Sequence, residues 1–515
     1  MRRFRTLLLL CVACVTALPG APPPKPKLVL AIVIDQFRYD YLLRFRKDYN
    51  SGLARLLDRG AVYTDAHYIH ATTVTAVGHS TFLSGATPSV SGIIGNEWYD
   101  RASNATVTSV SDPETKLVGS SRAGSSPRRL LVSTVGDELK SQGGDSKVIG
   151  ISIKDRSAIL PAGHMADAAY WYDDTSHSWV TSTFYRDALP AWAQEINAAG
   201  PEKKYASAKW VPLENPGAAP FCVMGASETR LCRSVETAPW GNEMIEDFAE
   251  HAILGENLGR HNSTDILAVS FSANDYVGHA VGPDDPAVRD MSVRTDRLLG
   301  KLFDFADRQA GAGNTLVILS ADHGVSPVPE VNQRRKMPGG RLRGEALIAK
   351  INEALSARFG AGKWVLSGSA TNLYLDLDLI AKLKLDAAQV ERVAADSMAS
   401  EPHIARVVTR HELAGGRVQQ DSIGRAMSLG YFGPRSGDLF VLQEPYYLFD
   451  AAGTSHGTPY DYDTHIPVIF MGTGIKPASY SRAVAPNDIA PTLAVILGVA
   501  EPGGSVGHVL SELVQ

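Results

Sequence analysis

Residues 28–35 read Leu-Val-Leu-Ala-Ile-Val-Ile-Asp, seven apolar residues followed by a carboxylate. An uninterrupted apolar run of this length is typical of a strand that is buried on both faces in a parallel sheet. Four similar runs follow along the chain, at Lys147 to Ile153, Asp265 to Phe271, Thr315 to Ser320 and Ile466 to Met471. We therefore expect five strands of one central, largely parallel sheet.

Helical patterns lie between these runs, at Leu53 to Leu57, Leu130 to Leu139, Asp296 to Phe305 and Asp488 to Leu497. In the first and last of them the apolar residues stop just before a glycine, which commonly ends a helix. The alternation of strands and helices predicts an α/β sandwich with helices on both faces of the sheet.

Two stretches break the alternation, at about residues 161–242 and 332–453, and both are rich in turn residues and aromatics. We expect them to be insertions on the core. Within the second stretch, Thr371 to Asp376 and Asp438 to Leu442 are candidates for pairing in a small accessory sheet.

Residues of the types that bind metals stand close to the apolar runs, and most of them come just after the end of a run. Ligands of open α/β sheets bind beyond the carboxyl ends of the strands, so one edge of the sheet would gather these side chains. An aspartate after a strand is by itself usually a helix cap or a turn residue, but an ordered set of carboxylates and imidazoles suits two zinc ions. The candidate ligands are Asp35, Asp275, His279, Asp322, His323 and His456.

A threonine-rich segment, Thr72 to Ser80, lies between the first and second ligand candidates. Judged alone, Thr75 before a run of small residues is a helix cap. Next to a zinc ion the same hydroxyl becomes a nucleophile, because the metal makes its alkoxide accessible, and the start of a helix favours an incoming anion. The surrounding ligand candidates favour the second interpretation.

The first twenty residues have the features of an export signal, with Arg2, Arg3 and Arg5 before an apolar stretch too short to span a bilayer. A lipoprotein signal is the less favoured alternative. Residues 21–27 form a proline-rich tether, and a catalytic region would occupy 28–515. We expect a periplasmic or secreted protein without a transmembrane segment after signal removal.

Removal of the signal leaves two cysteines, Cys222 and Cys232. A local disulfide is the simplest interpretation for an exported chain, and two buried thiols are the alternative.

The net charge of −5 gives no excess of basic residues, so a nucleic-acid partner is not expected.

With these residues assembled, the chain resembles the alkaline phosphatase superfamily, and within it the bacterial alkaline phosphatases related to nucleotide pyrophosphatase/phosphodiesterases. The resemblance covers nearly the whole chain after residue 27. The segments that carry it are Val33 to Gln36, Thr73 to His79, Gly92 to Asn96, Lys154 to Arg156, Asp275 to His279, Ala321 to Gly324 and His456-Gly457.

The resemblance implies that one zinc is held by Asp35, Thr75, Asp322 and His323, and the other by Asp275, His279 and His456. His465 is the alternative to His456. It also implies that Asn96, Lys154 and Arg156 contact the non-bridging oxygens of the phosphate. A solvated charged turn is the less favoured interpretation of Lys154 and Arg156, because they directly follow the apolar run Lys147 to Ile153.

Two cations aimed at phosphate oxygens favour a monoester, which carries about one more negative charge than a diester. The expected protein is therefore a zinc-dependent alkaline phosphatase that hydrolyses small phosphate monoesters through a phosphothreonine. The enzymatic alternative is a phosphodiesterase or nucleotide pyrophosphatase with the same two metals. A sulfatase is less favoured, and the alternative outside enzymes is a periplasmic protein that only binds zinc or phosphate.

Overall fold

The computed structural model describes residues 25–120, 122–225, 230–369 and 371–514. The expected export signal at 1–20 lies outside these residues, as does most of the tether. The centre of the described chain is an eleven-stranded sheet with the strand order β21-β2-β20-β13-β1-β12-β7-β8-β9-β5-β6.

The middle of the sheet is parallel, as expected. Strand β1 (Leu28–Ile34) pairs with β13 (Thr315–Ser320) on one side and with β12 (Asp265–Phe271) on the other, and β12 pairs with β7 (Val148–Ser152). Because Val33 lies opposite both Ser270 and Ser320, the three central strands end at the same level. The groups that follow these strands therefore meet at one edge.

The fifth expected strand, β20 (Val468–Gly472), belongs to the sheet but runs antiparallel to β13. The chain enters β20 from the segment around His465, which pairs with His67 at the far end of β2 (Ala61–Ala66). Since that segment lies at the carboxyl edge of the parallel strands, the strand that leaves it must run in the opposite direction. The outer strands are β21 (Ala478–Val484), β5 (Ser111–Val118) and β6 (Ala123–Ser125).

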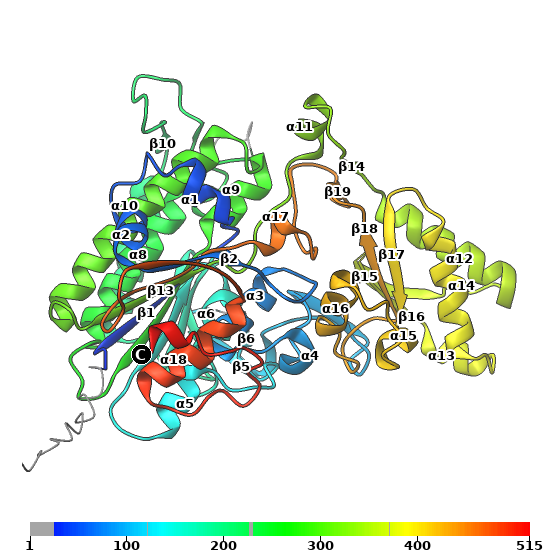
Figure 1. Cartoon of the computed structure of the whole chain (residues 1–515), viewed down its shortest axis with the longest axis horizontal. Helices are drawn as coiled ribbons and strands as arrows, with labels where there is room; N and C mark the ends of the chain where they lie inside the picture. The colour runs from blue at the N-terminus through cyan, green and yellow to red at the C-terminus, as the bar shows by residue number, and fades with distance from the viewer. Residues whose placement is uncertain (1–24, 121, 226–229, 370, 515) are drawn as a thin grey trace, which may run out of the picture.

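Helices cover both faces of the sheet, which confirms the predicted sandwich (Figure 1). One face carries α2 (Gly52–Arg59), α8 (Pro239–Gly255) and α10 (Pro286–Ala310), and the other carries α3 (Thr75–Ser84), α5 (Val135–Ser141), α6 (Asp155–Ala162) and α18 (Ile489–Leu497). The helix expected from Leu130 starts later, because Thr134 and Asp137 form a capping box that fixes its first turn.

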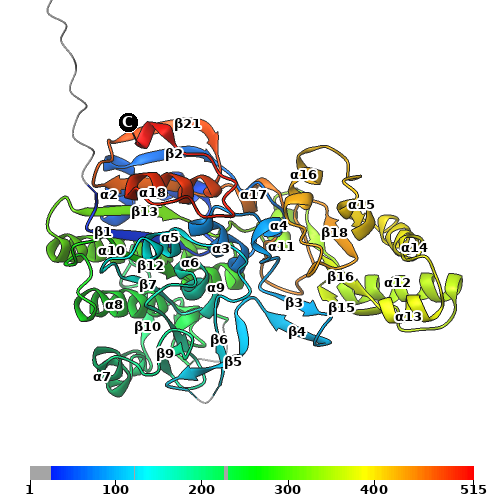
Figure 2. The ribbon, with the colours of Figure 1, turned by 90° about the horizontal axis from the view of Figure 1, so that it is seen from below.

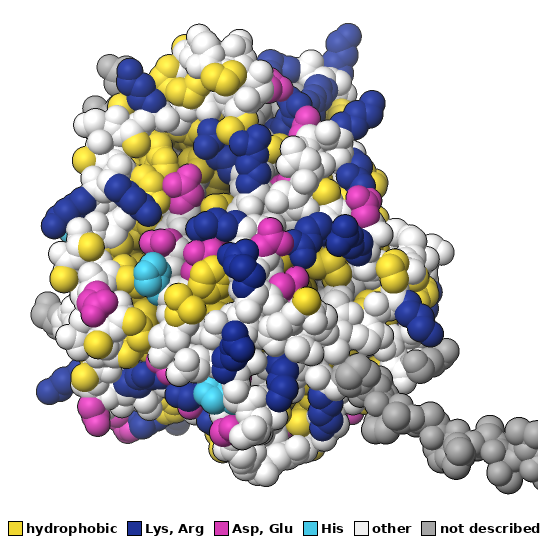
Figure 3. All heavy atoms as spheres, turned by 90° about the vertical axis from the view of Figure 1, so that its left-hand side faces the viewer, with side chains coloured by type: hydrophobic (Ala, Val, Ile, Leu, Met, Phe, Trp, Pro, Cys, Tyr) yellow, Lys and Arg dark blue, Asp and Glu magenta, His cyan; other side chains and the backbone are white. Residues whose placement is uncertain are grey.

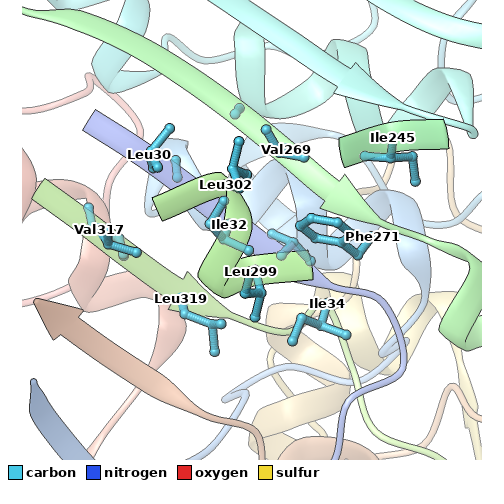
Figure 4. Packing of buried hydrophobic residues seen from close by; sticks show 14 of the residues in the cluster. Leu30, Ile32, Ile34, Ile245, Val269, Phe271, Leu299, Leu302, Val317 and Leu319 are labelled. Atoms are coloured by element: carbon cyan, nitrogen blue, oxygen red, sulfur yellow. The ribbon is translucent and has the colours of Figure 1, made fainter. Parts of the chain in front are cut away.

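The main core lies between β1 and the helices that cover it. Figure 4 shows Leu30, Ile32 and Ile34 beside Leu299 and Leu302 of α10, and all five side chains are fully buried. Burial of each such side chain stabilises the fold by roughly 1.5–3 kcal/mol. The strand ends that carry the functional residues are thus anchored in a tightly packed layer.

The expectation that residues 161–242 form an insertion is partly wrong. Strands β8 (Ala168–Asp173) and β9 (Ser178–Ser182) extend the main sheet, with β8 parallel to β7. Among the aromatic residues of this stretch, Tyr170, Trp171, Tyr172 and Trp179 are buried in these two strands. The rest of the stretch includes the antiparallel pair β10 (Lys209–Trp210) and β11 (Cys222–Val223). The predicted disulfide between Cys222 and Cys232 is confirmed.

The second stretch contains an accessory lobe, residues 344–443, that stands beside the main body (Figure 2). Its four-stranded antiparallel sheet has the order β15 (Val365–Ser369), β16 (Asn372–Leu375), β18 (Leu439–Gln443) and β17 (Ile404–Thr409). The predicted pairing of residues 371–376 with 438–442 is confirmed by β16 and β18. Helices α12 (Gly344–Phe359) and α14 (Ala387–Ala399) pack on this sheet around a core of its own.

The lobe approaches the main body next to the hairpin β3 (Glu97–Asp100) and β4 (Ala105–Thr108), where Arg101 donates to the carbonyl of Leu375 and pairs with Asp438.

Within the described chain, no helix is both long and apolar enough for a membrane span. On the face drawn in Figure 3, basic and acidic side chains are interspersed.

Candidate active site and metal centre

Three neighbouring strands deliver candidate ligands to the same edge of the sheet. Asp35 follows β1, and Asp322 and His323 follow β13. After β12 the chain turns into α9 (Ala273–Val281), which places Asp275 and His279 one helical turn apart. The sequence-based expectation that one strand edge gathers these residues is therefore realised in the fold.

The first group consists of Asp35, Asp322 and His323. Nε2 of His323 lies 3.6 Å from Oδ1 of Asp35 and 3.3 Å from Oδ2 of Asp322, and the three residues are at most 1% exposed. Each of these three atoms is buried without a hydrogen-bond partner. Unpaired buried carboxylate oxygens are costly, so two of them converging with an imidazole nitrogen fit a bound cation.

The second group consists of Asp275, His279 and His456. Nε2 of His279 lies 3.2 Å from Oδ1 of Asp275, and Nε2 of His456 lies 3.2 Å from Nε2 of His279. The Nδ1 atom of each histidine bonds a backbone carbonyl, of Thr454 and of Thr73 respectively. A carbonyl only accepts, so Nδ1 carries the proton and Nε2 of each ring is left to face the group.

The two groups adjoin each other. The rings of His323 and His456 stack with centroids 3.5 Å apart, and Asp275, His323 and His456 also present three atoms that together can hold an ion. His465, the alternative to His456, lies elsewhere: its Nε2 bonds the carbonyl of Thr64, and its ring stacks between Tyr39 and His67. The structure thus brings His456 to the second group.

Lys154 stands at the junction of the two groups. Its Nζ lies 2.7 Å from Oδ2 of Asp35 and 2.7 Å from Oδ2 of Asp275, and the side chain is buried. Burial alone raises the pKa of Asp275, but the charges of His279 and Lys154 outweigh it and hold that pKa well below its usual range. The pKa of Asp322 is raised well above its usual range by burial and by the neighbouring charge of Asp35.

Thr75 is the first residue of α3 and is 1% exposed. The helix starts there because Val74 is extended and the segment after it contains small residues. The next amide, that of Ala76, donates to Oδ1 of Asn96 at 2.8 Å. This bond fixes the Asn96 side chain beside the start of the helix, so the structure brings Asn96 close to Thr75.

A cavity of about 770 Å³ opens beside these residues, and Asn96, Lys154 and Arg156 all line it. Nε of Arg156 is buried without a hydrogen-bond partner. The wall also includes Trp171 and Tyr276 of the main body, with Nζ of Lys154 4.9 Å from the centroid of the Tyr276 ring, and Asn372 and Phe440 of the accessory lobe. The end of the cavity at Lys154, beside the two Asp/His groups, is called its inner end; an anion can bind there, and the rest of the cavity has space for a larger substituent.

Sequence reasoning missed the roles of Gln36, Thr73 and His79, which contact the groups without belonging to them. Gln36 bonds Asp322 and Asp275, Thr73 accepts from His456, and Nδ1 of His79 bonds the carbonyl of Thr75. All three residues lie inside the motifs that carry the family resemblance, and this was the signal that the sequence offered. The partners of Gln36 and Thr73 are more than two hundred positions away, so only the fold reveals these bonds.

Two adjoining Asp/His groups that could hold metal ions, at the edge of an α/β sheet, are an arrangement typical of two-metal hydrolases, which include phosphatases and nucleases. Residues 29–465 match the family model described as type I phosphodiesterase / nucleotide pyrophosphatase, and the chain belongs to this family. The resemblance to the alkaline phosphatase superfamily is thereby confirmed.

Curated relatives match along almost the whole chain. Alkaline phosphatase PhoV of Synechococcus elongatus is 36% identical over 520 residues, covering 95% of this chain and 93% of PhoV. Alkaline phosphatase PafA of Elizabethkingia meningoseptica is 33% identical over 539 residues and 98% of each chain. The crystal structure of PafA superimposes with a TM-score of 0.89 over 96% of this chain and 99% of PafA.

A more distant solved structure, murine ectonucleotide pyrophosphatase / phosphodiesterase 5, shares the fold. It is 13% identical, with a TM-score of 0.51 over 93% of this chain and 96% of the murine protein. The fold is thus shared by proteins named alkaline phosphatase and by one named pyrophosphatase / phosphodiesterase, so the fold alone does not decide between these activities.

Proposed function

We propose that this chain is an exported, zinc-dependent alkaline phosphatase that hydrolyses phosphate monoesters through a phosphothreonine on Thr75. The observation that carries the proposal is the placement of Lys154 between the two Asp/His groups, in a cavity also lined by Asn96 and Arg156. The names of PhoV and PafA, which match along nearly the whole chain, support it.

Zinc fits the donor sets of the two groups, which combine carboxylates with imidazoles whose Nε2 atoms face inward. Asp35, Thr75, Asp322 and His323 would hold one ion, and Asp275, His279 and His456 the other. Bound zinc would lower the pKa of a hydroxyl or water and neutralise charge that develops on oxygen.

In the proposed reaction, Oγ1 of Thr75 attacks phosphorus in line with the ester bond. The new Oγ1–P bond forms as the bond from phosphorus to the leaving oxygen breaks, and the leaving alcohol takes up a proton. Water then cleaves the Oγ1–P bond, which releases inorganic phosphate and restores the threonine. Throughout, Asn96, Lys154 and Arg156 hold the non-bridging oxygens as charge redistributes among them.

A preference for monoesters follows from the two cationic side chains at the inner end of the cavity. The family description also names phosphodiesterases, so a diesterase using the same groups is the second candidate. Rates on para-nitrophenyl phosphate and on bis-para-nitrophenyl phosphate distinguish them. We expect a clear preference for the monoester, and a preference for the diester in purified protein would overturn the assignment.

A direct test of the covalent step is a search for phosphate bound to Thr75. Acid quenching of the enzyme during turnover, followed by mass spectrometry of peptides, should find phosphothreonine at this position. A Thr75→Ala variant that turned over monoesters at the parental rate would point to a protein that binds phosphate without this chemistry.

Export belongs to the proposal because the signal at residues 1–20 is a sequence feature alone. N-terminal sequencing of the protein recovered from the periplasm or the medium should start near residue 21. A chain retained in the cytoplasm with Met1 intact would contradict it.

A further inference from the structure

Gln36 adopts a backbone conformation that is unusual for its residue type. It follows Asp35 directly, has a φ of 59° and is only 3% exposed. A residue with a Cβ is disfavoured in this left-handed region, which glycine enters freely. Conformations of this kind persist where surrounding contacts impose them, and they concentrate at functional sites.

The contacts of Gln36 reach both metal-binding groups. Its backbone N–H donates to Oδ1 of Asp322 at 3.0 Å, and its side-chain Nε2 donates to Oδ1 of Asp275 at 2.5 Å. Asp322 belongs to the first group and Asp275 to the second. A single buried residue therefore bonds one carboxylate in each.

The two bonds have different origins within the residue. The N–H bond to Asp322 comes from the backbone, and it engages Oδ1 while Oδ2 faces His323. The bond to Asp275 needs the full length of the side chain. Glycine would suit the backbone and preserve the first bond, but the second exists only because a glutamine stands here.

The fold also leaves space for this amide. A Cβ built on Gly278 would lie 1.8 Å from Oε1 of Gln36, a distance that no pair of unbonded atoms tolerates. Gly278 lies inside α9, between Asp275 and His279. The absence of a side chain at Gly278 thus allows the Gln36 amide to reach the carboxylate one turn away.

We infer that Gln36 is a positioning residue that couples the two metal-binding groups: its backbone orients Asp322 and its side chain orients Asp275. The inference rests on the proposed function, because it assumes that both groups hold zinc. Removal of a residue that orients a metal ligand in this way typically lowers metal affinity or activity by about 10- to 100-fold.

The test uses Gln36→Gly in the full mature protein. This change suits a φ of 59° and keeps the N–H bond to Asp322, but it removes the bond to Asp275. The metal-free protein is titrated with zinc against a chromophoric chelator. We expect two sites in the parent, and in the variant one site with unchanged affinity and one that is about 10- to 100-fold weaker.

The control is Lys336→Gly, which makes the same backbone change at an exposed position with a φ of 60°. It should leave both zinc affinities unchanged. Parental affinity at both sites of Gln36→Gly would overturn the inference. A parent protein that binds no zinc would instead contradict the proposed function, and with it the inference.

A second variant perturbs the same bond from the opposite side. Gly278→Ala places a methyl group against Oε1 of Gln36 and should displace the amide, with the same selective loss of affinity at one site. In the Gln36→Gly background the methyl group meets no amide, so the double variant should match Gln36→Gly alone. Losses that multiply in the double variant would show that the two positions act independently and would overturn the inference.

Discussion

The two metal-binding groups are built from similar residues but differ in their access to water. The side chains of Asp35, Asp322 and His323 are completely buried, whereas the side chain of His279 in the second group is 35% exposed. The first group is connected to the start of α3 through His79, whose Nδ1 lies 3.3 Å from Oδ2 of Asp322 and bonds the carbonyl of Thr75. We therefore propose a division of labour in which the buried group holds Thr75 and the open group exchanges the leaving alcohol and water.

Their imidazoles also differ in protonation. Burial lowers the pKa of His323 to about 3, so this ring is neutral at physiological pH. Burial also acts to lower the pKa of His279, but the carboxylate of Asp275 outweighs it and raises that pKa to about 9. Burial, with the charges of His323 and His279, also holds the pKa of His456 well below its usual range, so without metal His323 and His456 are neutral and His279 is protonated.

The largest expected effect is the loss of the nucleophile. Thr75→Ala should lower kcat for a phosphate monoester by at least about 10⁴-fold, as removal of nucleophiles does in other hydrolases. Single-turnover kinetics check this, and zinc content serves as the control for an intact site. Activity within tenfold of the parent would refute the assignment of Thr75 to covalent chemistry.

The next effect compares one histidine from each group. His323→Ala leaves two carboxylates buried together without their imidazole, so we expect loss of zinc at the first group that added metal does not restore. His279→Ala alters the exposed side of the second group, and millimolar zinc should recover part of its activity. Equal responses of the two variants to added zinc would remove the distinction between the groups.

A third prediction concerns the cations at the inner end of the cavity. Lys154→Ala combined with Arg156→Ala should reduce monoester turnover by about 10²- to 10³-fold or more, because at least one donor to the charged oxygens is lost. Diester turnover should fall much less. The ratio of the two rates is the measurement, and an unchanged ratio would argue that these side chains do not select the monoester.

A fourth, smaller effect is a dependence of metal affinity on pH. Zinc must displace the proton of His279, whose pKa is about 9, so affinity at the second group should rise about tenfold per pH unit from pH 6.5 to 9 and then level off. In the metal-free protein the same raised pKa stabilises the fold below pH 6.5, and this contribution is lost as pH rises through 9. Chelator competition and thermal denaturation across this range test both parts.

The smallest effect on activity is expected outside both groups. Cys222→Ser removes a disulfide that closes a ten-residue separation, and the free energy of unfolding should fall by about 2–4 kcal/mol. Because neither cysteine is a candidate ligand or lines the cavity, kcat should remain unchanged at temperatures where the fold persists. A matching loss under reducing conditions in the parent supports the assignment.

The sequence predicts much of this molecule because the signals are local. The β1 run and the residues directly after the strands indicate both the sheet and the first ligand group. The features that the sequence could not predict depend on pairing between distant segments. The apolar run of β20 does not indicate whether the strand is parallel or antiparallel to β13. The aromatic residues of β8 suggest a surface insertion because the sequence does not show that β8 pairs with β7. Likewise, the bonds of Gln36 join residues more than two hundred positions apart.

The accessory lobe has a consequence for how such enzymes diversify. It has its own core and its own sheet, yet it contributes Asn372 and Phe440 to the outer wall of the cavity. The candidate ligands and Thr75 all come from the other part of the chain. We therefore propose that the lobe is a module whose replacement, by evolution or by protein engineering, would change which alcohols are accommodated and leave the reaction chemistry unaltered.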